Sequence, residues 1–100
     1  MYKILIIQDS PSINIVLKFR LESGGFALVD TVETGQEGLK KIKENPYQLI
    51  LLDYKLPDTT GDELCRLLKK DAKTAQIPVI FISGQDEIAK RGKAGGHPAV

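Results

Sequence analysis

The most constraining feature of this sequence is the run Leu49–Asp53, in which four consecutive apolar residues lead into a carboxylate. A run without polar alternation is typical of a strand buried on both faces, as in the middle of a parallel sheet. Burying an aspartate without a partner is costly, so Asp53 is predicted to mark the point where the strand leaves the core. In open α/β sheets, ligands bind at this carboxyl end of a central strand.

Two other apolar runs end in the same way. Ile4–Ile7 is followed by Gln8-Asp9, and Val79–Ile82 is followed by Ser83. If the three strands are parallel neighbours, two carboxylates and a hydroxyl meet at one rim of the sheet, where a hard cation and an oxyanion could bind. The alternative interpretation is that each polar residue only caps its strand or the following helix.

Helix signals lie between the apolar runs. Ser10-Pro11 indicates a capped helix start, and the pairs Thr34/Glu37 and Thr60/Glu63 have the spacing of capping boxes. Gly24-Gly25 and Asn45-Pro46 are typical of helix ends. The apolar residues expected to face the core from these helices are Ile13, Val16, Leu17, Phe19, Leu21, Leu39, Ile42, Leu64, Leu67 and Leu68.

Strands and helices therefore alternate along the chain. Phe26–Val32 is predicted to be a further strand near the sheet edge, and Gln85–Lys93 a weakly apolar fourth helix. This alternation predicts βαβ units, a parallel sheet with right-handed crossovers and helices on both faces. The expected fold class is a doubly wound α/β sheet.

Composition narrows the class of protein. One hundred residues make one small domain, expected to span residues 1–100, and a net charge of +1 gives no basis for binding nucleic acid or an anionic membrane. Cys65 is the single cysteine, so no internal disulfide forms and a reducing cytoplasmic location is expected. No run approaches the roughly 20 apolar residues of a membrane span.

Taken as a set, these motifs resemble the receiver domain of two-component response regulators. The resemblance extends from Tyr2 to about Gly95 and depends on Asp9, the block Leu52–Gly61 and Ile82-Ser83-Gly84. It implies a flavodoxin-like sheet in strand order 2-1-3-4-5 with five helices. It also implies a signalling function rather than an enzymatic one, with a sensor histidine kinase or phosphotransfer protein as phosphoryl donor and a downstream protein as target.

The resemblance assigns roles to individual residues. Asp53 resembles the phosphoacceptor, and Asp9 the direct ligand of Mg²⁺, together with Asp53 and the backbone carbonyl of Lys55. Ser83 resembles the hydroxyl residue that hydrogen-bonds the phosphoryl group and reorients when that group arrives. Gly84, without a side chain, would leave its N–H open to a phosphate oxygen. These residue types suit the chemistry, because Mg²⁺ prefers oxygen ligands and offsets the repulsion between carboxylates.

The sequence departs from the family in two places. Gln8 stands where a second acidic residue usually holds the metal through water, so weaker Mg²⁺ binding is expected. The chain ends at Val100, before the lysine of strand five, so we expect strand five to be short or missing, helix five to be absent and the domain to be incomplete at its C-terminus. Val79–Ile82 would then be an apolar edge, which favours a homodimer formed by edge-strand pairing or segment exchange.

Two other functional classes are alternatives to a phosphorylated receiver. A degenerate receiver would fold and act as a binding or dimerisation module without phosphorylation, as Gln8 and the missing lysine suggest. An enzyme fits poorly, since the sequence contains no phosphate-binding Gly-x-x-x-x-Gly-Lys, no Gly-x-Gly-x-x-Gly and no Gly-x-Ser-x-Gly. A dehalogenase-like hydrolase would need a second aspartate at position 55, where Lys55 stands.

Overall fold

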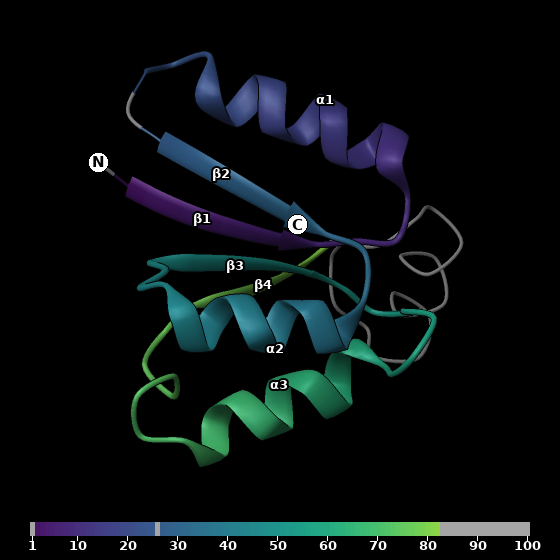
Figure 1. Cartoon of the computed structure of the whole chain (residues 1–100), viewed down its shortest axis with the longest axis vertical. Coiled ribbons are helices and arrows are strands. Elements are labelled where there is room, and N and C mark those ends of the chain that lie inside the picture. The colour runs from purple at the N-terminus through teal and green to yellow at the C-terminus, as the bar shows by residue number, and fades with distance from the viewer. Residues whose placement is uncertain (1, 26, 83–100) are drawn as a thin grey trace, which may run out of the picture.

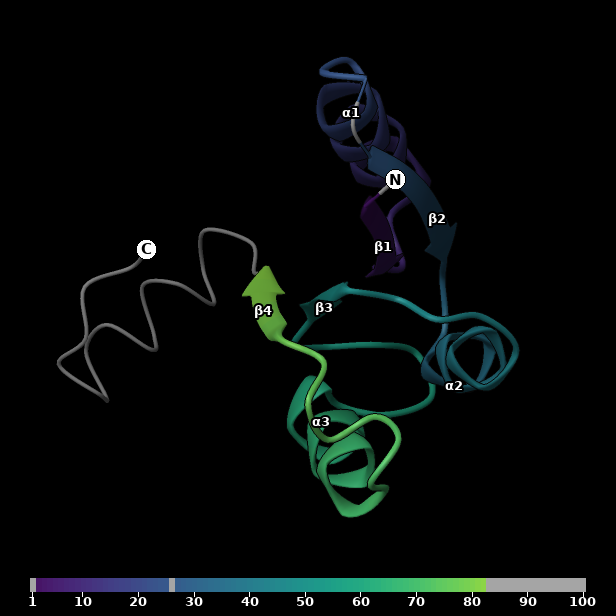
Figure 2. The ribbon, with the colours of Figure 1, turned by 90° about the vertical axis from the view of Figure 1, so that its left-hand side faces the viewer.

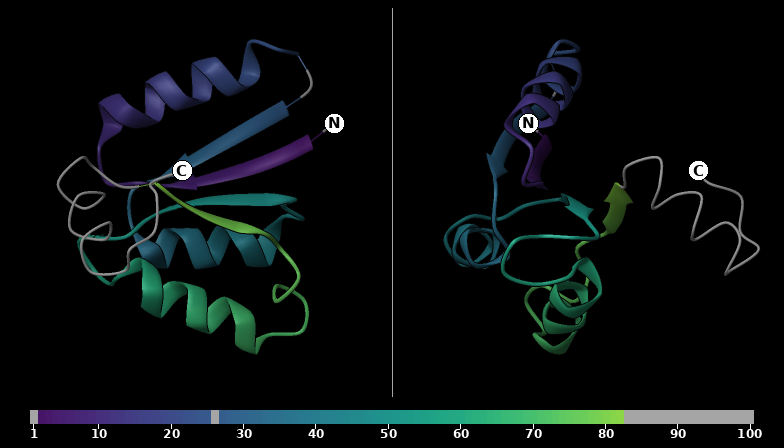
Figure 3. Two further views of the ribbon diagram at one scale, coloured as in Figure 1. Left: turned by 180° about the vertical axis from the view of Figure 1, so that it is seen from behind. Right: turned by 90° about the vertical axis from the view of Figure 1, so that its right-hand side faces the viewer.

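The computed structural model describes residues 2–25 and 27–82. In this part of the chain, strands and helices alternate and all four strands are parallel, in the order β2-β1-β3-β4 (Figure 1; Figure 3, left). The predicted doubly wound fold and the edge position of β2 are thereby confirmed. The elements are β1 (Tyr2–Ile7), α1 (Pro11–Glu22), β2 (Ala27–Val32), α2 (Gly35–Glu44), β3 (Leu49–Asp53), α3 (Gly61–Lys70) and β4 (Val79–Ile82).

Helices cover both faces of the sheet. Figure 2 shows α1 on one side and α2 and α3 on the other. Alternate strand residues divide accordingly: Leu5 and Ile7 belong to the larger core under α2 and α3, whereas Ile4 and Ile6 pack with α1. Strands β1 and β3 contribute residues to both cores, which explains why their sequences show no polar alternation.

The predicted caps are present at the start of each helix. Side-chain oxygens of Ser10, Thr34 and Thr60 accept hydrogen bonds from the backbone N–H three residues on, at 3.4, 3.1 and 3.2 Å. Asn45 ends α2 as expected. Local sequence therefore fixes these boundaries, because each cap satisfies an N–H group that the helix itself leaves unpaired.

The predicted inward stripe of α1 is wrong in part. Leu17 and Leu21 pack against the core, but Ile13, Val16 and Phe19 are 44, 52 and 74% exposed. Leu67 of α3, also expected in the core, is 41% exposed, whereas Leu64 and Leu68 are buried. Helix α1 carries apolar residues on more than one face, so its sequence alone does not select the face that meets the sheet.

Several predictions concern residues outside the described ranges. These are the fourth helix, strand five, helix five and the positions of Ser83 and Gly84. Within the described ranges, β4 lies at the edge of the sheet opposite β2. Cys65 is partly buried against the larger core, consistent with a packing role. In residues 2–25 and 27–82, no helix is both long and apolar enough to cross a bilayer.

Candidate functional site

Two carboxylates stand at the ends of neighbouring strands. Strands β1 and β3 pair in parallel, with Ile7 opposite Leu52 at the end of the ladder. Asp53 is the next residue of β3, and Asp9 lies two residues beyond Ile7. The sequence predicted this juxtaposition at the carboxyl edge of the sheet, which is the ligand-binding edge in folds of this class.

The two carboxylates differ in their surroundings. Asp53 is 8% exposed, whereas Asp9 lies on the surface. The chain is tightly packed behind Asp53: a Cβ atom at Gly61 would lie 2.7 Å from the carbonyl oxygen of Asp53 and 2.9 Å from the Cα of Tyr54. Only glycine fits such a close approach between backbones. Gly61 therefore fixes the course of the chain as it leaves β3.

The loop after Asp53 is closed by two backbone hydrogen bonds. The N–H of Gly61 donates to the carbonyl of Tyr54 at 2.6 Å, and the N–H of Leu56 donates to the carbonyl of Thr59 at 3.0 Å. Lys55 lies between these bonds, opposite Thr60 in an antiparallel bridge. In such a pair the flanking residues make the hydrogen bonds, so the carbonyl of Lys55 is directed away from Thr60 and out of the loop.

Gln8 lies at the same edge and is buried, with 6% of its surface exposed. Its side-chain oxygen accepts a hydrogen bond from the N–H of Ser10 at 3.2 Å. The amide of Asn14, 4% exposed, donates to the carbonyl of Gln8 at 2.8 Å, and its own oxygen has no hydrogen-bond partner in the described residues. Two neutral amides therefore order the turn from β1 into α1. The sequence gives no signal for this role of Asn14, which is one of several polar residues in α1.

Asp58 is a further residue that sequence reasoning missed. Its two carboxylate oxygens accept hydrogen bonds from the N–H groups of Gly35 and Gln36, each at 2.9 Å. These donors are the first residues of α2, so the carboxylate connects the Asp53 loop to a helix N-terminus, where negative charge is favoured. The bonds hold the pKa of Asp58 below its ordinary value, with the Gly35 N–H as the largest cause.

The donor atoms at this edge suit a hard divalent cation. Asp9, Asp53 and the carbonyl of Lys55 carry oxygen atoms, and oxygen is the ligand type that Mg²⁺ prefers; Mg²⁺ typically binds one or two carboxylates and keeps several waters. Residues 2–25 and 27–82 contain no group of three or more histidine, cysteine, aspartate or glutamate side chains that could hold a metal. The predicted residues Ser83 and Gly84 lie outside the described ranges.

Comparison with known proteins places this architecture in a family. The family model for the response regulator receiver domain matches residues 4–99. The phosphate regulon transcriptional regulatory protein PhoB of Rhizobium meliloti is 34% identical over 89 residues, which are 89% of this chain and 39% of that protein. The transcriptional regulatory protein ResD of Bacillus subtilis is 37% identical over 89% of this chain and 35% of its own length. The chain thus spans less than half of these relatives.

Solved structures agree with this placement. A sensor protein from Polaromonas sp. JS666 superposes with a TM-score of 0.82 at 31% identity, covering 94% of this chain and 72% of that one. The MaeR response regulator bound to beryllium trifluoride gives a TM-score of 0.79 at 29% identity, covering 100% of this chain and 80% of that one. Both the family model and the superpositions extend over nearly the whole sequence. The chain therefore belongs to the response regulator receiver domain family of two-component signalling.

Proposed function

We propose that this chain, residues 1–100, is a phosphoacceptor receiver domain in which Mg²⁺-dependent phosphorylation of Asp53 changes contacts with other proteins. The observation that carries the proposal is the placement of Asp9 and Asp53 at the ends of paired strands. The backbone behind Asp53 is closely packed against Gly61 and the residue has little exposed surface, as suits a group that must meet a phosphorus atom in one orientation.

The metal site would consist of Asp9, Asp53 and the carbonyl of Lys55. A bound Mg²⁺ would neutralise the two carboxylates and the phosphoryl oxygens. The Lys55 carbonyl is directed out of its loop by the hydrogen bonds on either side of it, which suits this role. Gln8 adds no charge to the site, and its oxygen already accepts from the N–H of Ser10, so we expect Mg²⁺ to bind more weakly than with an acidic residue at position 8.

The reaction is transfer of a phosphoryl group to a carboxylate oxygen of Asp53. A bond forms between that oxygen and phosphorus, and the bond from phosphorus to the donor breaks, with its electron pair leaving on the donor atom. The donor is a phosphohistidine of a kinase or phosphotransfer protein, and the leaving group is then the histidine side chain. Acetyl phosphate can also serve as the donor, and its leaving group is acetate. Ser83 and the N–H of Gly84 are proposed to hydrogen-bond the phosphoryl oxygens.

The relatives support this assignment. MaeR was solved with beryllium trifluoride, and we propose that the same anion binds at Asp53 of this chain. We propose that the downstream target of this receiver domain is a protein. The expectation that this domain makes no nucleic-acid contact stays a prediction, because PhoB and ResD are named as transcriptional regulators and are much longer. Homodimer formation and a cytoplasmic location also stay predictions.

Acetyl phosphate labelling tests the proposal. Incubation with acetyl phosphate and Mg²⁺ should add the mass of one phosphoryl group to the wild type. Asp53→Asn should gain none, and Asp71→Asn should label like the wild type, because Asp71 lies at the far end of α3. Removal of Mg²⁺ with a chelator should abolish labelling. A folded wild-type protein that gains no phosphoryl group would contradict the proposal.

A degenerate receiver is the second candidate. The neutral Gln8 and the absence of a third metal-binding side chain among the described residues favour it. Such a module would bind partners in one state only. Mg²⁺ with beryllium trifluoride would then leave the thermal stability unchanged, whereas a phosphoacceptor should be stabilised in proportion to its affinity for the pair. Asp53→Asn serves as the control, since it should not respond in either case.

A further inference from the structure

Strand β2 has the properties of an edge strand that could form backbone hydrogen bonds with a strand of another chain. It lies at one edge of the sheet formed by the described residues, where half of its backbone N–H and C=O groups point away from β1. Its sequence, Ala-Leu-Val-Asp-Thr-Val, is rich in β-branched residues, and Leu28 is 50% exposed. Exposed edges of this kind promote pairing with other chains unless something blocks them.

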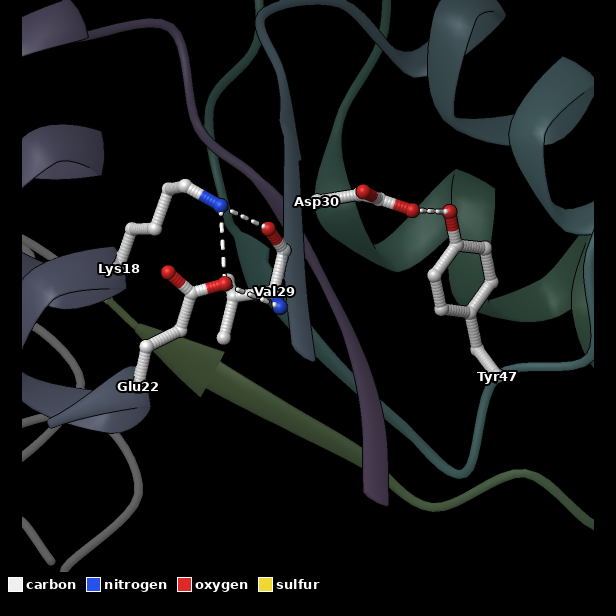
Figure 4. Close-up of polar contacts among 5 residues, drawn as sticks. All are labelled: Lys18, Glu22, Val29, Asp30 and Tyr47. Carbon is white, nitrogen blue, oxygen red and sulfur yellow. Dashed lines mark hydrogen bonds and ion pairs between the residues drawn. The ribbon is translucent and has the colours of Figure 1, made fainter. Parts of the chain in front are cut away.

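Two side chains of α1 occupy the outward-facing backbone groups at the centre of β2. The carboxylate of Glu22 accepts a hydrogen bond from the N–H of Val29 at 2.9 Å, and the ammonium of Lys18 donates to the carbonyl of Val29 at 2.6 Å. Lys18 also pairs with Glu22 at 2.9 Å, one helical turn away (Figure 4). The donor and the acceptor that an added strand would need at Val29 are thus both occupied.

The charge state and the neighbouring residue support this arrangement. The pKa of Glu22 is lowered, first by the Val29 N–H and then by Lys18, so its carboxylate is ionised at neutral pH. On the other face of β2, the hydroxyl of Tyr47 donates to the carboxylate of Asp30 (Figure 4). Both faces of the middle of β2 are thereby held by side chains from other elements.

We propose that Lys18 and Glu22 close the β2 edge against pairing with β2 of a second copy of this chain. The second copy is the occupant that fits, because a two-fold axis at Val29 would bring two identical strands together antiparallel, each supplying the N–H and C=O that the other needs. To pair in this way, both copies must displace Lys18 and Glu22 and leave their charges without these partners. Any strand-mediated dimer of the wild type therefore uses another edge.

The double variant Lys18→Ala/Glu22→Ala tests the proposal directly. Its solution mass, measured by light scattering over a series of concentrations, should rise from the wild-type value toward twice that value. Adding Leu28→Lys to the double variant should return the mass to the wild-type value, because a charge on the exposed edge opposes pairing. Glu63→Ala/Arg66→Ala is the matched control: it removes an ion pair within helix α3, at 2.5 Å, that makes no hydrogen bond to the backbone of β2, and its mass should not change.

Amide exchange supplies a measurement on the wild type itself. The N–H of Val29 should exchange at least about ten times more slowly in the wild type than in Glu22→Ala, because the variant loses one charge-assisted hydrogen bond. Glu22→Gln keeps an acceptor oxygen and should retain most of this protection. The proposal is overturned if the double variant keeps the wild-type mass, if Leu28→Lys fails to reverse association, or if Val29 is unprotected in the wild type.

Discussion

Asp58 and Gly35, 23 residues apart in sequence, are joined by a hydrogen bond of 2.9 Å from the Gly35 N–H to the Asp58 carboxylate. A second bond reaches the other carboxylate oxygen from Gln36. The contact is close, because a Cβ at Gly35 would lie 2.5 Å from the methyl group of Thr59. The loop that follows the proposed phosphoacceptor is therefore fixed at its tip as well as at its base.

Removing the Asp58 carboxylate should destabilise the domain. We expect Asp58→Ala to lower the free energy of unfolding by about 1–2 kcal/mol, because two N–H groups of α2 lose their acceptor. Asp58→Asn keeps one acceptor oxygen, so its loss should be about half as large. Urea denaturation measures both values. Equal stability of the wild type and Asp58→Ala would show that the link contributes nothing.

The same contact predicts a pH dependence. The folded-state pKa of Asp58 is lower than its ordinary value of 3.8. A lowered pKa contributes stability that is complete above the unfolded pKa and is lost as the pH falls through the folded pKa. The difference in unfolding free energy between the wild type and Asp58→Asn should therefore be constant near neutrality and shrink below about pH 4. A difference that persists unchanged in acid would exclude the charged carboxylate as its source.

Gln8 offers a test of the metal site. With Asp9 and Asp53 nearby, Gln8→Asp should lower the half-saturating Mg²⁺ concentration for acetyl phosphate labelling by about tenfold, or about 1.4 kcal/mol. In a chelator the same variant should be less stable than the wild type, since a third carboxylate is added beside two others at a buried position. Gln8→Asn is the neutral control. If Mg²⁺ fails to stabilise Gln8→Asp, position 8 is not part of the site.

Two glycines should respond differently to alanine. A Cβ at Gly61 meets the backbone at Asp53 and Tyr54, whereas a Cβ at Gly38 meets the Ile7 side chain, at 2.5 Å from its Cδ1. We expect Gly38→Ala to cost about 1–3 kcal/mol, and Ile7→Val to recover part of that cost by removing the contacting methyl group. Gly61→Ala should cost more, because backbone cannot repack as a side chain does. Urea denaturation measures the unfolding free energy of each variant. The double variant Gly61→Ala/Ile7→Val should show no recovery, because the atoms nearest to an added Cβ at Gly61 do not belong to Ile7.

The order of elements could be predicted from the sequence because local physics fixes it. Apolar runs define the buried strands, and hydroxyl residues at Ser10, Thr34 and Thr60 cap the helices through groups only three residues away. The placement of Asp9 and Asp53 after the carboxyl ends of two paired strands also follows, because parallel strands end at the same edge of a sheet.

Local patterns along the chain are therefore enough to predict the alternation of elements, the parallel sheet and the placement of Asp9 and Asp53 after the ends of their strands. Packing between elements selects the buried face of α1, which leaves Phe19 exposed while Leu17 packs inward. The same packing brings Asp58 to the N-terminus of α2 and Glu22 to the backbone of Val29. Helix caps and apolar strand runs depend on residues that are neighbours in sequence, so a local pattern predicts them. The contacts of Asp58 and Glu22 join separate elements, so they depend on how those elements pack and no local pattern encodes them.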